Sequence, residues 1–490
     1  MIENPERIAR ELRLLLKKRR RTSPATIERA LAPLATFAVT KLQSRAPPPA
    51  KRMIAASAWG SLAQDLNKRL LFALGPTLRI EQIASRALAR GSNKRTGFSL
   101  NEATRTFPGL LETAAQIVSA WIHAQKELIV RLKRDRALLR KHFAPDRRAL
   151  RVIAIRPSLS DPHDCGRTVT RVGFSPKRRV IYKPRRCDGE KLWFAALRWL
   201  NRNGVDSRFK IPTLLARKNY HWMEFLRRTD CRSSSAVRSF YFRWGAQAAL
   251  AQILGASDLH RENWLAVGMQ PILLDAELIG SKESRGRRTR SKDRQRLSFL
   301  LQTGLVPLTA RDRAGFYEGI APLDATLART DRVSCWPTYN GIPQSPVHYI
   351  NELVRGFETV AAIFANRKSA RKFYKQIISA ARWPRETRTL FRPSAEYARI
   401  LVESLMSDRM TSRNKRRRWL AQKCSASAAT RAVAVAEACA LFRCDIPKFS
   451  ERHRRGPISS KEFSAAIAQL KSASRVLGRR VCLGAPERKT

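Results

Sequence analysis

The length and composition of the chain describe a globular protein with a large positive charge. It has 490 residues, 43% of them hydrophobic, and at roughly 100 to 200 residues per domain it is long enough for two to four domains. Lysine and arginine number 96 against 39 aspartate and glutamate, so the formal net charge is +57. These values exclude a small disulfide-stapled module and a chain that is mostly a disordered basic tail.

The charge does not by itself identify a partner. A positive protein attracts nucleic acid, a membrane surface, nucleotide phosphates or an acidic peptide. The arginines are dispersed, with dense basic runs at 17–21, 285–290 and 415–418, and no module that reads nucleic acid is recognisable. We therefore do not expect nucleic acid as the partner, and an arginine-rich composition spread over solvated faces explains the charge equally well.

The N-terminal segment and the cysteines favour a cytoplasmic location. Residues 1–21 mix three glutamates with basic residues and have no continuous apolar stretch, which is typical of an amphipathic basic helix and not of a signal peptide. Eight scattered cysteines without a CxxC pair indicate reduced thiols. No stretch is apolar enough to cross a bilayer, although the basic first helix could recruit the protein to a membrane surface.

The first third of the chain is predicted to be helical. Periodic apolar positions predict helix over about 5–42, a break at Pro47 to Pro49, further helix to Ala89 and a long helix over 113–143. The pattern then changes to strands at 151–155, 168–174 and 179–184, which predict a small antiparallel sheet.

The middle of the chain carries most of the chemistry. Helices are predicted over 189–203 and 235–254, with a strand at 219–226 between them. The segment 255–280 then places a polar loop, a short strand, a turn and a second strand that ends in acidic residues.

Three residues of that segment have a spacing close to that of a protein-kinase site. Asp258 precedes Asn263 by five residues, and Asp275 follows Asn263 by twelve. In protein kinases a catalytic Asp, an Asn five residues later and a further Asp beyond a hairpin hold the acceptor hydroxyl and the metal ions. Lys183 ends a predicted strand, where a lysine can reach nucleotide phosphates. The alternative interpretation is an ordinary loop in which Asp258 and Asn263 only cap local structure.

The predicted sheet does not begin like that of a protein kinase. No glycine loop precedes Lys183; in its place, His163 and Arg167 flank a turn made by Gly166.

Taken in order, these segments resemble the dehydratase domain of class II lanthipeptide synthetases. The segments that carry the resemblance are SDPHDCGRTV (160–169), VIYKPR (180–185), YHWMEFL (220–226), SDLHRENW (257–264), LLDAELIG (273–280), QTGLVPL (302–308), GFETV (356–360), TRTLFRPSAEYARIL (387–401) and EACALFRCDIPKF (437–449). The resemblance covers about residues 90–449.

The resemblance implies an α+β fold with a lipid-kinase-like, two-lobed catalytic core and large, mostly α-helical additions. It also implies an enzyme that uses ATP and Mg²⁺ to phosphorylate Ser and Thr of a precursor peptide and then eliminates the phosphate. The phosphorylation roles are assigned by matching motifs: Lys183 and Arg167 toward ATP, Asp258 and His260 in the catalytic loop, and Asn263, Asp275 and Glu277 as magnesium ligands.

Elimination needs a base for the Cα proton and cations that stabilise the departing phosphate. The resemblance assigns Asp161, His163, Arg388 and Ser394 to that step. Arginine offers a bidentate fork for phosphate and serine a hydroxyl donor. The alternative for Arg388 and Arg392 is that they are two more surface arginines in an arginine-rich chain.

The chain departs from the family pattern in several places. Ser394 stands where the family usually has Thr, and Cys444 and Lys448 replace the usual Gly and Tyr. Full synthetases continue into a zinc-dependent cyclase, and beyond position 449 only His453 and Cys482 could bind zinc, too few for that site. We therefore expect no zinc, and either a stand-alone dehydratase or a truncated synthetase that retains only dehydration. Cyclisation would then need another protein, a separate cyclase that could act with a transporter, or would not occur.

Four regions are expected: an N-terminal helical region (1–90), the kinase-like part (91–280), the remainder of the dehydratase (281–450) and a basic tail (451–490). The precursor peptide is expected to carry an acidic leader that the positive charge attracts. Two other functions stay open. One is a kinase that stops at the phosphopeptide or acts on a small molecule, and the other is an inactive basic protein that binds nucleic acid.

Overall fold

The computed structural model shows a protein of two compact units. Unit 1 comprises Met1–Arg186, Thr213–Phe225 and Leu390–Lys448, and unit 2 comprises Cys187–Pro212, Leu226–Thr389 and Phe449–Thr490. The structure describes residues 3–18, 26–90, 99–146, 150–205, 207–279, 299–307, 321–324, 327, 333–378, 383–384, 386–389, 391–412, 414–426, 428–452 and 457–482. The basic run 285–290, position 308 and His453 lie outside the described residues.

The N-terminal part of unit 1 is helical, as the periodicity predicts. Its helices are α1 (Pro5–Lys18), α2 (Ile27–Arg45), α3 (Pro48–Met53), α4 (Ala56–Arg90), α5 (Leu100–Thr106) and α6 (Pro108–Phe143). At the predicted proline-rich break, α2 ends and α3 begins with Pro48 as its first residue. Proline is tolerated at this position because the first helical residue has no backbone hydrogen bond to lose. Helix α6 begins five residues earlier than predicted, at Pro108, and buries an apolar face that includes Leu110, Trp121 and Leu139.

A five-stranded antiparallel sheet completes the core of unit 1. Its strands are β1 (Ala154–Arg156), β2 (Thr170–Gly173), β3 (Arg179–Lys183), β4 (Leu214–Ala216) and β5 (His221–Glu224), in the order β1-β2-β3-β5-β4. The predicted antiparallel sheet is confirmed, and β4 and β5 extend it. Val172, Val180 and Trp222 point into the core, where each is 0% exposed. Lys183, the last residue of β3, pairs with His221 of β5.

The C-terminal part of unit 1 consists of four helices joined by buried polar contacts. They are α12 (Ser394–Ser404), α13 (Ser407–Met410), α14 (Lys415–Ser425) and α15 (Arg431–Phe442). The guanidinium of Arg392 donates to both carboxylate oxygens of Glu437 at 3.0 and 2.9 Å, and Tyr397 donates to the same carboxylate at 2.6 Å. Arg392 therefore ties the start of α12 to α15, and it is not a surface arginine.

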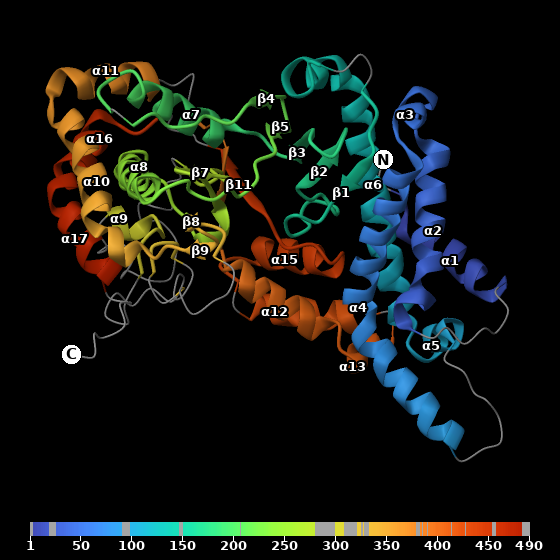
Figure 1. The fold of residues 1–490 in the computed structure, drawn as a ribbon. Helices are drawn as coiled ribbons and strands as arrows, with labels where there is room; N and C mark the ends of the chain where they lie inside the picture. The colour runs from blue at the N-terminus through green and yellow to red at the C-terminus, as the bar shows by residue number, and fades with distance from the viewer. Residues whose placement is uncertain are drawn as a thin grey trace. The chain divides into compact units, whose positions relative to one another are not determined.

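Unit 2 is built around two closely packed helices. Helices α8 (Ser234–Ile253) and α10 (Ile350–Ala365) lie side by side in Figure 1. A Cβ atom at Gly245 would lie 1.8 Å from the carbonyl oxygen of Leu353, and one at Gly356 would lie 1.9 Å from that of Phe242. Only glycine allows the two backbones to approach this closely.

The remaining elements of unit 2 surround this pair. They are α7 (Asp188–Leu200), the 3₁₀ turn η1 (Arg261–Asn263), β6 (Trp264–Val267), β7 (Gln270–Leu273), α9 (Phe299–Gln302), β8 (Thr338–Tyr339), β9 (Ile342–Pro343), the 3₁₀ turn η6 (Pro346–Tyr349), α11 (Arg367–Ile377), β10 (Glu386–Thr389), β11 (Phe449–Arg452), α16 (Ser460–Ala468) and α17 (Leu470–Cys482). Strands β6 and β7 form the predicted hairpin, and β10 pairs with β11. The mixture of helices and antiparallel strands is an α+β fold.

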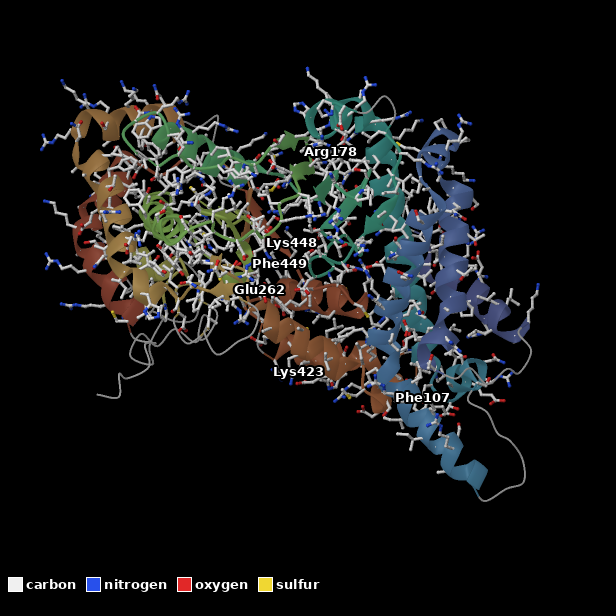
Figure 2. All side chains as sticks on the ribbon, viewed as in Figure 1. Phe107, Arg178, Glu262, Lys423, Lys448 and Phe449 are labelled. Carbon is white, nitrogen blue, oxygen red and sulfur yellow. The ribbon has the colours of Figure 1, made fainter. Side chains whose placement is uncertain are left out.

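The surface carries the charge that the composition predicts. Nitrogen-tipped side chains project from the outer helices of unit 2, among them α11 and α17 (Figure 2). Helix α11 has the sequence RKSARKFYKQI, with basic residues and no acidic one, and buries Phe373 and Ile377. None of the helices in the described part of the chain combines the length and the hydropathy needed to span a membrane.

Candidate functional site

The loop between α8 and β6 brings Asp258 and Asn263 together. The side-chain amide nitrogen of Asn263 donates to the backbone carbonyl of Asp258 at 2.7 Å, and its backbone N–H donates to the carbonyl of His260 at 3.0 Å. Asp258 has φ +61°, a left-handed conformation that aspartate adopts more readily than most residues. The amide nitrogen is thus committed to the loop, and the amide oxygen of Asn263 is the atom that can serve a cation.

His260 also belongs to this loop. Its Nδ1 accepts a hydrogen bond from the backbone N–H of Glu262 at 3.3 Å, at the start of the 3₁₀ turn η1. The neutral ring therefore carries its proton on Nε2. The neighbouring Glu262, labelled in Figure 2, is exposed. His260 shapes the loop by capping the turn.

The strand β7 of the hairpin leads back to the same loop. The backbone N–H of Leu274 donates to the carbonyl of Asn263 at 2.7 Å, directly before Asp275. The carboxylate of Asp275 accepts from the backbone N–H of Glu277 at 3.1 Å. The predicted return of a second carboxylate to the Asp258–Asn263 loop is therefore present within unit 2.

Arg388 of β10 joins this cluster through Glu277. Its Nη1 donates to Oε1 of Glu277 at 2.7 Å, and the two side chains are 12% and 15% exposed. Within the described residues the Nε of Arg388 is buried and has no hydrogen-bond partner. A guanidinium that is half satisfied by a carboxylate can still bind an anion through its remaining N–H groups.

These charges set the ionisation of Asp258. Burial of its carboxyl raises the pKa of Asp258 to about 6, and the carboxylates of Glu277 and Asp275 act in the same direction. His260 and Arg388 act in the opposite direction and lower this pKa. Asp258 is therefore close to half ionised near pH 6 and ionised at neutral pH, the state that a general base requires.

Close backbone packing supports the acidic end of the hairpin. Gly189, in the first turn of α7, lies against Ala276, the residue between Asp275 and Glu277. A Cβ atom at position 189 would lie 1.9 Å from the carbonyl oxygen of Ala276. Sequence reasoning missed this role, although the glycine next to Asp188 at a helix start was the available signal.

The donor set suits a hard cation that also binds phosphate. Asn263, Asp275 and Glu277 offer only oxygen atoms, which Mg²⁺ prefers, and they leave positions for substrate phosphates. In the described parts of the chain, no group of three or more His, Cys, Asp and Glu side chains is arranged so that it could hold a metal ion. A magnesium ion held by these three residues would need further ligands, which nucleotide phosphates and water supply in phosphotransfer enzymes.

A second cluster lies in unit 1, at the turn before β2. His163 and Arg167 pair across the turn, with backbone hydrogen bonds of 2.9 and 2.8 Å between them. The three residues between them, Asp164, Cys165 and Gly166, all have positive φ values, of 45°, 69° and 78°. The predicted turn is confirmed, and Asp161 lies exposed just before it.

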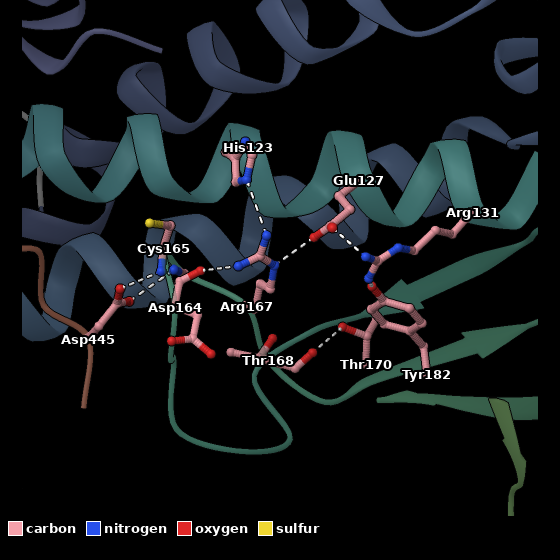
Figure 3. Close-up of polar contacts among 11 residues, drawn as sticks. His123, Glu127, Arg131, Asp164, Cys165, Arg167, Thr168, Thr170, Tyr182 and Asp445 are labelled. Carbon is pink, nitrogen blue, oxygen red and sulfur yellow. Dashed lines mark hydrogen bonds and ion pairs between the residues drawn. The ribbon is translucent and has the colours of Figure 1, made fainter. Parts of the chain in front are cut away.

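A carboxylate outside the predicted set holds this turn. Asp445 accepts from the backbone N–H groups of Cys165 and Gly166, at 2.8 and 2.9 Å (Figure 3). The Nδ1 of His163 lies 2.7 Å from the carbonyl oxygen of Ile446. Burial raises the pKa of Asp445 to about 6, against the effect of the two N–H donors and Arg443. Sequence reasoning read the segment around Asp445 only as a family motif.

Arg167 is held by a polar ladder on α6. Its Nε donates to Glu127 at 2.6 Å, its Nη1 donates to the carbonyl of Asp164 at 2.6 Å, and its Nη2 lies 3.5 Å from His123 (Figure 3). Glu127 also accepts from Arg131. His123, Glu127 and Arg131 are spaced by four residues and so share one helix face, a signal that was present in the sequence.

The last two predicted residues also lie in unit 1. Lys183 ends β3 and is a buried residue, 5% exposed. Ser394 is the first residue of α12 and is partly buried. Ser394 lies two residues after Arg392, which is anchored by Glu437. Because Ser394 is the first residue of α12, its hydroxyl lies at the N-terminus of that helix.

The chain belongs to a protein family described as "Domain of unknown function (DUF4135)", whose model matches residues 107–324 and 320–452. The chain is also similar to a curated protein, the lacticin 481/lactococcin biosynthesis protein LcnDR2 of Lactococcus lactis subsp. lactis. The two are 20% identical over 346 residues, which are 62% of this chain and 37% of the relative. The chain therefore spans little more than a third of the length of that relative.

Proposed function

We propose that this protein is a lanthipeptide dehydratase, which phosphorylates Ser and Thr hydroxyls of a precursor peptide and then eliminates the phosphate. The similarity to a lacticin 481/lactococcin biosynthesis protein supports a role in modifying such a peptide. The observation that carries the chemistry is the closed loop of unit 2, in which Asn263 bonds to Asp258 at 2.7 Å beside Asp275 and Glu277.

In the phosphorylation step Asp258 orients the acceptor hydroxyl and takes its proton. The hydroxyl oxygen forms a bond to the γ-phosphorus of ATP while the bond to the bridging oxygen breaks, and ADP leaves. Asn263, Asp275 and Glu277 would hold Mg²⁺, which supplies charge neutralisation at the phosphates. Lys183 and Arg167 are proposed to bind nucleotide phosphates, and His260 keeps the loop in shape.

In the elimination step His163, with Asp161, removes the Cα proton of the phosphorylated residue. The electron pair forms the Cα–Cβ double bond, the Cβ–O bond breaks and phosphate leaves, which gives dehydroalanine or dehydrobutyrine. Arg388, through its N–H groups that Glu277 leaves unbound, and the hydroxyl of Ser394 are proposed to stabilise the departing phosphate.

The proposal includes a lipid-kinase-like, two-lobed core. The antiparallel sheet that ends in Lys183 is one element of such a core, and the loop and acidic hairpin of unit 2 are the other. The precursor peptide is proposed to carry an acidic leader, which the net charge of +57 would attract, and a cyclase or transporter would act on the product.

One observation favours a second candidate, a kinase that stops at the phosphopeptide. Arg388, assigned to phosphate elimination, is bound to Glu277, assigned to the metal. If Arg388 stays bound to Glu277, it holds a proposed magnesium ligand in place for phosphorylation. It is then not available to stabilise the phosphate that leaves during elimination.

Intact mass of a Ser/Thr-rich precursor peptide after incubation with ATP and Mg²⁺ tests both candidates. Loss of about 18 Da per modified residue, the mass of one water, supports the dehydratase, whereas gain of about 80 Da without that loss supports the kinase. An unchanged mass with the cognate peptide contradicts both.

A further inference from the structure

The imidazole of His163 is held in one defined tautomer. Its Nδ1 lies 2.7 Å from the carbonyl oxygen of Ile446, and a carbonyl oxygen can only accept. Nδ1 therefore carries the proton, and in the neutral ring the lone pair is on Nε2. His260 has the opposite arrangement, because its Nδ1 accepts from a backbone N–H. The partner of Nδ1 thus decides which atom of each ring can take up a proton.

The turn that follows His163 has a strained backbone, so its formation is unfavourable in free energy without other contacts. Asp164 and Cys165 have φ values of 45° and 69°, in the left-handed region where a side chain crowds the backbone and the conformation is strained. Gly166 follows at φ 78° and is pressed against α6, where a Cβ atom would lie 3.0 Å from the backbone of Ala120. The turn therefore needs stabilising contacts from outside.

Asp445 supplies those contacts. Its two carboxylate oxygens each accept one backbone N–H, from Cys165 at 2.8 Å and from Gly166 at 2.9 Å. Hydrogen bonds to an ionised acceptor are stronger than those between neutral groups. Asp445 is 1% exposed, so water does not compete for these bonds.

The segment that carries Asp445 is itself firmly anchored. Arg416, 1% exposed, donates to the carbonyls of Leu441 and Phe442 at 2.8 and 2.9 Å, at the end of α15. Ile446 is fixed from both sides: its N–H donates to the carbonyl of Pro162 at 2.8 Å, and its carbonyl accepts from the ring of His163. One rigid segment therefore holds both the turn and the imidazole.

We propose that Asp445 is a positioning residue for His163: its carboxylate holds the 164–166 turn so that the carbonyl of Ile446 fixes the imidazole with its lone pair on Nε2. This inference rests on the proposed function, in which His163 is the base of the elimination step. It adds a residue that acts through His163 and does not touch the peptide.

The test uses the full-length protein with Asp445→Asn. Asparagine keeps the shape of the side chain but replaces one acceptor oxygen by an NH₂ group that faces an N–H donor. The matched control is Asp135→Asn, because Asp135 is also in unit 1, is 0% exposed and accepts from Tyr220 at 2.6 Å and Trp222 at 2.8 Å. Three quantities are measured: phosphorylation of the precursor, elimination from a supplied phosphopeptide, and the ¹⁵N spectrum of the His163 ring, assigned with His163→Gln.

For Asp445→Asn we expect elimination to fall by about tenfold to a hundredfold, as for a misplaced base. Phosphorylation should fall less, because Glu127 of α6 still holds Arg167, the residue of this turn that is proposed to bind nucleotide phosphates. The Nδ1–H signature of His163 should give way to a mixture of tautomers. The Asp135→Asn control should change neither the ratio of the two steps nor the ring signature.

A second variant distinguishes the loss of this turn from a general loss of folding. Cys165→Gly, added to Asp445→Asn, removes the side chain that strains the turn at φ 69°, so the turn should form with less help. Recovery of elimination and of the Nδ1–H signature in the double variant supports the proposal. An unaltered His163 signature in Asp445→Asn, or an equal fall of both chemical steps, overturns it.

Failure of the proposed function gives a different result. A wild-type protein that neither phosphorylates nor dehydrates the peptide contradicts the dehydratase. The ring signature needs no substrate, so a loss of the Nδ1–H signature in Asp445→Asn still supports the positioning of His163 by Asp445, and its persistence still overturns it.

Discussion

Arg388 and Glu277 form an ion pair in which Nη1 lies 2.7 Å from Oε1, and both side chains are largely buried. The pair joins Arg388 of β10 to Glu277, which lies four residues after the end of β7. Glu277 and the other nearby carboxylates raise the pKa of Arg388 against the effect of burial, so the guanidinium stays charged. A residue assigned to elimination and a residue assigned to magnesium are therefore direct partners, and substitution of either changes the environment of the other.

The first prediction separates the two chemical steps at Arg388. Arg388→Lys keeps a positive charge beside Glu277 but removes the fork that binds phosphate. We expect phosphopeptide to accumulate while its elimination falls by at least about tenfold, followed by mass spectrometry over time. Arg399→Lys is the control, because Arg399 is an exposed partner of Glu403. Equal loss of both steps would show that Arg388 acts in phosphorylation.

The second prediction concerns the pH dependence of phosphorylation. The pKa of Asp258 is raised to about 6, and the base must be ionised to take the hydroxyl proton. The rate should therefore rise as the pH increases through about 6 and level off above about 7. Initial rates of phosphopeptide formation measure this. A flat profile between about pH 5 and about pH 8 would remove Asp258 from the role of base, and Asp258→Ala should abolish the step.

The third prediction is that Asp258→Asn stabilises the fold at neutral pH. A folded-state pKa of about 6, above the ordinary 3.8, means that the folded protein binds more protons than the unfolded chain between these values. The wild-type free energy of unfolding thus decreases as pH rises through this window, by at most about 3 kcal/mol for this group.

Thermal unfolding of both proteins measures the difference. Asp258→Asn should melt at a higher temperature at pH near 7, and the advantage should vanish below about pH 4, where Asp258 is protonated in both states. Asp408→Asn is the control, because the side chain of Asp408 is 61% exposed. A lower melting temperature for Asp258→Asn at neutral pH would contradict this account.

The fourth prediction tests the packing behind the acidic hairpin. Gly189→Ala places a Cβ atom 1.9 Å from the carbonyl oxygen of Ala276, so the backbone between Asp275 and Glu277 must shift. We expect phosphorylation to fall by about a hundredfold, since displacements near 1 Å at a reacting site have effects of this size. Gly60→Ala, in α4, has nothing within 4 Å of the added atom and should leave activity unchanged. Normal activity of Gly189→Ala would show that the hairpin tolerates the shift.

The fifth prediction concerns the buried pair that anchors α12. Glu437→Gln removes the bidentate partner of the buried Arg392, which keeps its ion pair to Glu396 at 3.0 Å. Breaking a buried pair costs about 3 to 5 kcal/mol, and we expect a loss near the lower value because one carboxylate remains. Chemical denaturation measures this loss. Glu403→Gln breaks the exposed pair with Arg399 and should cost less than about 0.5 kcal/mol. Equal effects of the two substitutions would contradict the assigned role of Arg392.

Much of the local structure could be predicted from the chain. The periodicity located α6 and α8 within a few residues, because burial of one helix face repeats at a fixed interval. The β-branched runs located β2 and β3, and the spacing of Asp258, Asn263 and Asp275 predicted a loop closed by a hairpin. These are features of residues close in sequence, whose geometry follows from the backbone.

The partners of the candidate site residues could not be predicted in the same way. Arg388 and Glu277 are separated by 111 residues, and Asp445 and Gly166 by 279. Nothing in a local pattern distinguishes Arg388 from the many other arginines of this chain. Which of them is buried depends on where β10 pairs with β11, and this register is decided by packing.

The sequence by itself determined the α+β composition, the positive charge and the turn between His163 and Arg167, because propensity, composition and a glycine act locally. Only the tertiary structure decided that Asp445 accepts the N–H groups of that turn, that Ile446 selects the tautomer of His163 and that Gly189 lies against Ala276. The physical reason is that hydrogen bonds and close contacts depend on distances of a few ångströms. Those distances between remote segments exist only after the core has packed.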